Sequence, residues 1–101
     1  MPLFIVLTRL TPTALKSPAT LEEAEKSIKT KIRENCPEVK WVNNYAVMGP
    51  YDYVDIFKAP DVETAFKVST IIRTFGHAQT EIWSATEWSD YKESVRNLAQ
   101  G

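Results

Sequence analysis

The chain has 101 residues, 44% of them hydrophobic and 25% charged, which is typical of a globular protein and excludes a disordered or fibrous one. This length predicts one domain, over residues 1–101. The 12 basic residues nearly balance the 13 acidic ones, so the net charge of −1 gives no electrostatic reason to expect nucleic acid or an anionic membrane as a partner.

The N-terminal residues and the cysteine content bear on location. Residues 3–7 form an apolar run that is too short to span a bilayer, and no basic segment or small-residue cleavage site accompanies it. Cys36 is the single cysteine, so no intramolecular disulfide can form, and this fits a reducing compartment. We therefore expect a cytoplasmic protein whose first apolar run is a strand.

The first half of the chain predicts a strand followed by a helix. Residues 3–9 are rich in Phe, Ile, Val and Leu on both faces, as in a central strand, and residues 11–19 are a Pro-containing loop. Thr20 with Glu23 three residues later predicts a capping box at the start of the helix, which Pro37 ends. The expected buried stripe of this helix is Leu21, Ala24, Ile28 and Ile32.

A β-hairpin and a second helix follow. Residues 39–48 and 53–58 are the second and third strands, and the turn between them spans residues 49–52. Asp61 is the expected N-cap of the second helix, and Gly76 is its expected C′ residue. The expected buried stripe is Ala65, Phe66, Ser69, Ile72 and Phe75.

The last two elements complete the predicted fold. Residues 79–85 are the fourth strand, and residues 90–100 are a short final helix with Tyr91, Val95 and Leu98 on one face. The order β-α-β-β-α-β predicts an α+β, ferredoxin-like fold, in which a four-stranded antiparallel sheet carries both main helices on one face. The other face of the sheet would be free of helices.

The helix-free face supplies the candidate site. Side chains alternate between the two faces of a strand, and we expect the small aliphatic ones to pack under the helices. The aromatic and polar side chains then fall on the helix-free face and are the candidate ligand-binding residues: Arg9, Trp41, Asn43, Tyr45, Tyr53, Asp55, Phe57, Glu81 and Trp83. Ile5 and Leu7 would share this face. Because such a face needs a cover, we expect a homodimer that encloses a cavity, with Arg9 as the cation for Asp55 or Glu81.

The predicted hairpin carries a family resemblance. Gly49-Pro50-Tyr51-Asp52 is followed by Tyr53-Val54, with Trp41-Val42 upstream and Thr80-Glu81 downstream. Over residues 3–88 this pattern resembles the GYD domain family of small bacterial proteins, and the resemblance implies a dimeric α/β barrel without implying one activity. The pattern is also similar to the small-molecule-binding domain of Lrp/AsnC-type regulators, here without a helix-turn-helix segment.

Several residues have both a functional and a structural interpretation. For Asp52 we favour a turn residue that binds backbone amides over a ligand carboxylate. For Asp55 we favour a pocket or interface ion pair over a solvated position. His77 is interpreted as a capping or solvated loop residue rather than a proton shuttle or haem ligand, and Cys36 as structural. One histidine and one cysteine do not predict a metal site.

Three functions remain open from the sequence. The leading hypothesis is a non-enzymatic, homodimeric small-ligand-binding or sensory module that needs no cofactor, with amino acids or small aromatic metabolites as ligands. The alternative is an enzyme of the dimeric α/β-barrel type, a cofactor-free oxygenase or isomerase or a haem-binding protein. Its candidate groups would be Asn43, Tyr45, Asp55, His77 and Trp83. The third is a purely structural assembly module.

Overall fold

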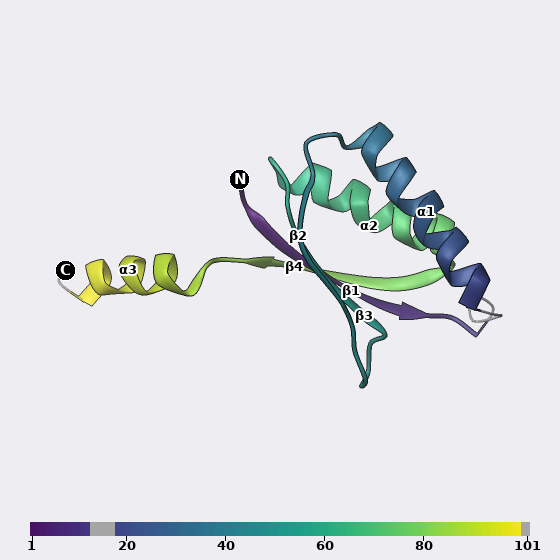
Figure 1. Cartoon of the computed structure of the whole chain (residues 1–101). Coiled ribbons are helices and arrows are strands. Elements are labelled where there is room, and N and C mark those ends of the chain that lie inside the picture. Colours follow the sequence, from purple (N-terminus) through teal and green to yellow (C-terminus); the bar gives the residue numbers. More distant parts are fainter. Residues whose placement is uncertain (13–17, 100–101) are drawn as a thin grey trace.

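A computed structural model describes residues 1–12 and 18–99 of the chain, and the order of its helices and strands is the predicted one (Figure 1). The predicted loop over residues 11–19 lies largely outside the described residues. The elements are β1 (Leu3–Leu10), α1 (Pro18–Asn35), β2 (Lys40–Ala46), β3 (Tyr53–Lys58), α2 (Val62–Gly76), β4 (Ala78–Ala85) and α3 (Trp88–Ala99).

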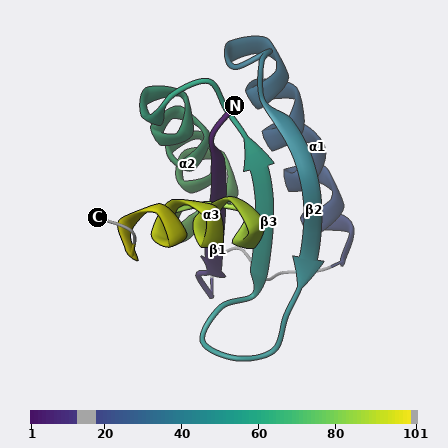
Figure 2. The same cartoon turned by 90° about the vertical axis from the view of Figure 1, so that its left-hand side faces the viewer.

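The four strands form one antiparallel sheet in the order β2-β3-β1-β4, which is the ferredoxin-like α+β arrangement. Figure 2 shows α1 and α2 together behind the sheet, while α3 lies in front of it. α3 extends away from the sheet and packs against no other helix or strand of the described chain (Figure 1). The face opposite α1 and α2 is therefore uncovered.

Two helix starts differ from the prediction. α1 begins at Pro18, two residues before Thr20, so Thr20 is not the N-cap. Proline is tolerated there because the first N–H groups of a helix have no intrahelical acceptor and the ring already holds a helical φ. α3 begins at Trp88 rather than at Asp90. The Trp88 ring stacks on the Tyr91 ring, with 5.6 Å between the ring centroids.

The cap at the start of α2 is confirmed, and the one at its end is not. The Asp61 carboxylate accepts hydrogen bonds from the Thr64 N–H at 2.7 Å and from the Thr64 hydroxyl at 2.6 Å. At the other end the left-handed residue is His77, with φ 49°, and Gly76 is still helical. Gly76 serves a different purpose, because a Cβ there would lie 3.0 Å from Cδ1 of Ile28. Its missing side chain lets α2 approach α1 closely.

Aromatic side chains fill the layer between the sheet and the helices, so the predicted division of the two sheet faces is wrong for β3. Phe57 is fully buried and stacks on Phe4 with 5.7 Å between ring centroids, and the Trp41 ring lies 5.5 Å away from it. The candidates found on the helix side instead of the helix-free side are Trp41, Tyr53, Asp55 and Phe57. The gap beneath two helices needs large side chains, and the small aliphatic ones of β3, Val54 and Ile56, point the other way.

A β-bulge explains why counting alternate residues fails in β2. The pairing register with β3 shifts between Trp41 and Asn43, so Val42 is the extra residue. Trp41 pairs with Phe57 on the helix side, whereas Asn43 pairs with Ile56 on the helix-free side. Trp41 and Asn43 therefore face opposite ways although they are two residues apart.

The buried stripe of α2 is also rotated from the predicted one. Its buried residues are Ala65, Val68, Ser69, Ile72 and Gly76. Phe66 is 62% exposed and Phe75 is 42% exposed, contrary to the prediction. The Phe75 ring instead faces the Lys31 ammonium, 5.4 Å from its centroid. Small residues on the buried side allow α2 to lie close to the sheet and to α1.

The turn between β2 and β3 is fastened to the end of β1. The Asp52 N–H donates to the Thr8 carbonyl at 2.8 Å, and the Asp52 carboxylate accepts from the Leu10 N–H at 2.8 Å. Arg9 donates from Nε to the Pro50 carbonyl at 2.7 Å and lies over the Tyr51 ring. The interpretation of Asp52 as a residue that binds backbone amides is confirmed, although the amide belongs to another strand. Arg9 pairs with neither Asp55 nor Glu81, contrary to the prediction.

The corrected faces predict unequal effects for two phenylalanine substitutions. Phe57→Ala should lower the free energy of unfolding by about 3–5 kcal/mol, because it leaves a cavity in the core. Phe66→Ala removes the same atoms from an exposed position and should change the free energy of unfolding by about 0.5 kcal/mol or less. Urea denaturation followed by tryptophan fluorescence measures both. Equal losses would contradict the assignment of Phe57 to the helix side.

Candidate functional site

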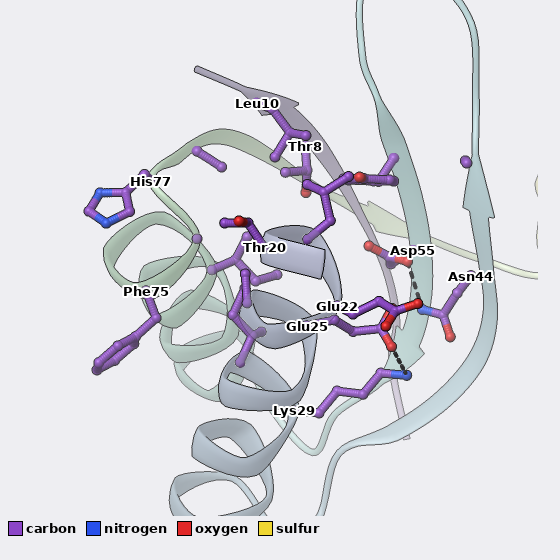
Figure 3. Close-up of a pocket in the computed structure, with 18 of the residues that line it drawn as sticks. Thr8, Leu10, Thr20, Glu22, Glu25, Lys29, Asn44, Asp55, Phe75 and His77 are labelled. Carbon is purple, nitrogen blue, oxygen red and sulfur yellow. Dashed lines mark hydrogen bonds and ion pairs between the residues drawn. The ribbon is translucent and has the colours of Figure 1, made fainter. Parts of the chain in front are cut away.

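A cavity of about 570 Å³ lies between the N-terminal half of α1 and the helix side of the sheet (Figure 3). Its walls come from β1, α1, β2 and β3, and from the junction of α2 with β4. The volume falls within the range of small-molecule sites, roughly 300–1,000 Å³. The cavity is therefore large enough for a metabolite of ordinary size.

The way α1 packs leaves this space open. Its C-terminal half reaches the core, where Ile32 and the following Cys36 are buried beside Phe4 and Phe57. Its N-terminal half carries Leu21 and Ala24 toward the sheet, but these side chains are only partly covered. The apolar part of the cavity wall is formed by Leu10, Leu21, Ala24, Ile28, Trp41 and Ile72.

Polar side chains gather on one side of the cavity, where β2 and β3 face α1 (Figure 3). Nδ2 of Asn44 donates to Oδ1 of Asp55 at 2.6 Å. Across from them on α1, Nζ of Lys29 lies 3.7 Å from Oε1 of Glu25, one turn earlier in the helix, and Glu22 is also part of the wall. The site thus combines carboxylates, an amide and one ammonium group beside an apolar wall.

Burial changes the acidity of two groups here. Burial raises the pKa of the Asp55 carboxyl above its usual range, against the opposing effects of the Asn44 hydrogen bond and the Lys29 charge. Glu25 adds to the increase by charge repulsion. Burial likewise raises the pKa of the Tyr53 phenol, with smaller contributions from Asp52, Glu25 and Asp55. The negative charge on Asp55 is therefore incompletely compensated.

Thr8 contributes a buried hydroxyl without a partner. Thr8 is 3% exposed, lines the cavity from β1, and its Oγ1 has no hydrogen-bond partner among the described residues. Its neighbour across the β1–β4 pairing, Thr80, differs because its hydroxyl shares a hydrogen bond of 2.7 Å with Ser69 of α2. Buried hydroxyls are normally paired, so Thr8 leaves an unsatisfied hydroxyl beside the cavity, although Oγ1 itself is covered rather than open to it.

The structure divides the candidate residues into three groups. Those that line the cavity are Trp41, Tyr53 and Asp55, together with Tyr45, whose pairing with Val54 directs its side chain to the helix-free face as predicted. Those on the helix-free face, outside the cavity, are Arg9, Asn43, Glu81 and Trp83. Phe57 belongs to the core. The predicted set therefore does not form one site.

Sequence reasoning missed six polar residues of the cavity, namely Thr8, Thr20, Glu22, Glu25, Lys29 and Asn44. The position of Thr8 in the sequence could have identified it, because it is the polar member of the alternating set Phe4, Val6 and Thr8 in an apolar strand. Glu25 and Lys29 are four residues apart, beside the apolar stripe of α1. A Glu–Lys pair with this spacing is equally typical of a solvent-exposed helix face, so it does not indicate a site. Asn44 lies two residues before Ala46, so alternation alone places it on the same face as that small aliphatic residue, which is the helix side.

His77 and Cys36 have the structural roles favoured from the sequence. His77 ends α2 in the left-handed conformation, and its carbonyl accepts from the Thr11 hydroxyl at 2.7 Å. Its ring points away from the group formed by Glu22, Glu25 and Asp55 (Figure 3). Cys36 is buried, and burial raises the pKa of its thiol, which disfavours the nucleophilic thiolate.

Two kinds of feature are absent from residues 1–12 and 18–99. Within these residues no three or more His, Cys, Asp and Glu side chains are grouped as metal ligands would be. None of the helices in this part of the chain combines the length and the apolar character that a membrane crossing requires.

Comparison with known families and curated proteins gives two matches. The family model described as GYD domain matches residues 4–95. A Thermus thermophilus protein called "Glutamine synthetase and cystathionine beta-lyase binding protein" is 31% identical over 94 residues, which cover 89% of this chain and 94% of that protein. Both matches extend over most of the chain, and the family model includes the residues that line the cavity and α3 as far as Val95.

Solved structures show the same fold. The crystal structure of TTHA0845 from Thermus thermophilus is 27% identical, with a TM-score of 0.56 over 86% of this chain and 95% of that one. The feast or famine regulatory protein of Mycobacterium tuberculosis, complexed with L-methionine, is 15% identical, with a TM-score of 0.61 over 86% of this chain. The leucine response regulatory protein of the same organism is 17% identical, with a TM-score of 0.54 over 85% of this chain. This chain spans about half of each regulator.

The raised pKa of Asp55 predicts a pH-dependent effect of Asp55→Asn. Because the pKa of Asp55 is higher in the folded than in the unfolded state, its carboxyl contributes to the free energy of unfolding at low pH, where it is protonated. This contribution is lost as the pH rises through the folded-state pKa. Asparagine keeps an acceptor for Asn44 but never ionises. At pH 7 the variant should therefore melt at a higher temperature than the parent protein, and this advantage should shrink as the pH falls toward the usual aspartate pKa of 3.8.

Thermal melts at several pH values, followed by circular dichroism, measure this difference. Glu38→Gln is the matched control, because it removes one charge from an exposed residue outside the cavity. A lower melting temperature for Asp55→Asn at pH 7 would contradict the uncompensated charge.

Proposed function

Since this chain belongs to the GYD domain family, we propose that it is a homodimeric small-ligand-binding or sensory module whose ligand occupies the cavity between α1 and the sheet. The observation that carries the proposal is the cavity itself, in which an apolar wall faces a small set of convergent polar groups. This combination of apolar walls with few placed polar groups is characteristic of small-molecule sites.

The comparisons supply the ligand class that we propose. One protein of the same fold has been crystallised with L-methionine, so the fold accommodates a small amino acid in that protein. The present cavity has side chains able to contact an ammonium group, a carboxylate and an apolar side chain, from Asp55, Lys29 and Ile28 respectively. We therefore place amino acids and small aromatic metabolites first among its ligands.

A protein partner is a second part of the proposal. The Thermus thermophilus relative is named for binding glutamine synthetase and cystathionine beta-lyase. By analogy, ligand binding in this protein would control its association with a metabolic enzyme. A cytoplasmic location would suit both the ligand and such a partner.

The uncovered face of the sheet supports the homodimer. The aliphatic side chains of Ile5, Val54 and Ile56 lie there beside Trp83, which is 50% exposed. α3 stands on the same side and presents an apolar stripe with no cover from the described chain: Trp88, Tyr91, Val95 and Leu98.

A second copy related by a two-fold axis could cover both apolar surfaces at once. Sedimentation equilibrium of the full chain should then report a dimer, and Ile56→Glu should shift it toward monomer. A monomeric parent protein at all concentrations would contradict this part of the proposal.

The cavity also favours a ligand-binding role over a purely structural assembly role. An assembly module needs apolar surfaces for its partner, and the helix-free face supplies them. It has no need of a space on the opposite side of the sheet beside Asp55, Asn44 and a Thr8 hydroxyl that no described residue satisfies.

Ligand-induced stabilisation tests the proposed function. A compound that binds the folded protein should, at a concentration 100 times its Kd, add about 2.7 kcal/mol to the free energy of unfolding. For a domain of this size that corresponds to a melting temperature higher by roughly 10–20 °C. Thermal melts with a panel of amino acids, amines, organic acids and small aromatic metabolites would identify such compounds.

A pair of variants locates the effect. Ala24→Phe places a large side chain into the cavity from α1 and should abolish the stabilisation, whereas Ser27→Phe adds a ring to an exposed position of the same helix and should leave it. If no compound stabilises the protein, or if Ala24→Phe responds as the parent protein does, the proposal is wrong.

A further inference from the structure

We infer that the cavity between α1 and the sheet selects ligands that carry an ammonium group on a small apolar body, in preference to carboxylic acids and neutral analogues. This inference rests on the proposed function and specifies the chemical class of its ligand. Three carboxylate side chains, Glu22, Glu25 and Asp55, face one lysine, Lys29, among the described residues that line the cavity. Glu22, Glu25 and Lys29 are solvent-exposed and Asp55 is half-buried, so the imbalance favours a cation chiefly through Asp55.

Asp55 is the group best placed to receive that cation. Its Oδ1 accepts the hydrogen bond from Asn44, which orients the carboxylate, while its Oδ2 has no partner among the described residues. The half-buried position weakens the competition from water. A ligand ammonium group has three donors, so it could bind the free Oδ2. Its positive charge would compensate the Asp55 carboxylate, which burial and the nearby Glu25 charge both destabilise.

Thr8 supplies an independent indication of a polar ligand group. Its buried Oγ1 lacks a partner among the described residues and lies on the same wall as Tyr53, its partner across the β1–β3 pairing. Leaving a buried hydroxyl unpaired costs free energy. Oγ1 itself is covered, so a donor of the ligand would reach it only after the Thr8 side chain turns toward the cavity. The need for a polar atom near Thr8 does not depend on the count of carboxylates.

Lys29 offsets only part of this preference for a cation, although its charge acts on Asp55 more strongly than that of Glu25 does. Its Nζ already lies 3.7 Å from Oε1 of Glu25, so a ligand carboxylate would have to compete with that pair. The same carboxylate would face the like charges of Glu22 and Asp55. A zwitterionic amino acid should therefore bind less tightly than the amine of the same shape, and the corresponding acid should bind least tightly.

The rest of the cavity sets the body of the ligand. Leu10, Ile28 and Ile72 form an aliphatic wall, and the Trp41 indole borders it. These side chains offer no charged group, so they suit an aromatic or branched aliphatic body. An arylalkylamine combines both requirements.

Isothermal titration calorimetry at neutral pH with four probes of similar shape tests the inference. The probes are 2-phenylethylamine, L-phenylalanine, 2-phenylethanol and 3-phenylpropionate. We expect the amine to bind at least about tenfold more tightly than the alcohol, since a charge-assisted contact is worth that much. The amino acid should fall between the amine and the acid.

Variants test the roles of the named residues. Asp55→Asn should lower the affinity for the amine about tenfold and leave that for the alcohol unchanged, whereas the charge-matched control Glu38→Gln should alter neither. Lys29→Gln should raise the affinity for the amine, because it removes the competing cation and frees Glu25. The two cavity variants thus shift amine binding in opposite directions.

The outcomes separate this inference from the proposed function. If the alcohol or the acid binds as tightly as the amine, or if Asp55→Asn binds the amine as the parent protein does, the ligand class is wrong and the binding function stands. If non-amine compounds alone stabilise the protein, the same conclusion holds. If neither these probes nor any compound of the wider panel binds, both the ligand class and the proposed function are wrong.

Discussion

The stacking of Phe57 on Phe4, with Trp41 beside them, determines which way the third strand faces, and the site follows from it. Phe57 is fully buried under the helices, so Asp55 and Tyr53, two and four residues earlier, must point to the same side. On that side α1 reaches the core with its C-terminal half and stands away from the sheet with its N-terminal half. The cavity is the space that this arrangement leaves.

The polar groups of the cavity make the folded protein less stable than an apolar filling would. An aspartate whose charge is incompletely compensated and a threonine hydroxyl with no partner in the described part of the chain both oppose folding. Their presence beside a space of about 570 Å³ is understandable if a ligand completes their interactions. The helix-free face has a different character, because its aliphatic residues and the α3 stripe suit contact with a second copy.

Much of the fold could be predicted from the sequence, whereas the location of the site could not. The order of elements, the bounds of β3 and the Asp61 cap follow from periodicity and capping chemistry, which are local. The face assignment is confirmed for β1 and β4. It failed for β3, because it assumed that aliphatic rather than aromatic side chains lie under the helices, and for Trp41, because the bulge at Val42 reverses the alternation in β2. The cavity depends on how far α1 stands from the sheet, and this distance is set by packing between segments far apart in sequence, such as Gly76 against Ile28.

The central claim is that the ligand site lies on the helix side of the sheet. Nuclear magnetic resonance of the ¹⁵N-labelled full chain, titrated with 2-phenylethylamine, tests it most directly. The account predicts shifts of the Thr8 and Tyr53 amides and of the Asn44 side-chain amide, with little change at Asn43 or at the Trp83 indole. Shifts at Asn43 and Trp83, with Thr8 and Asn44 unaffected, would place the site on the helix-free face and contradict the account.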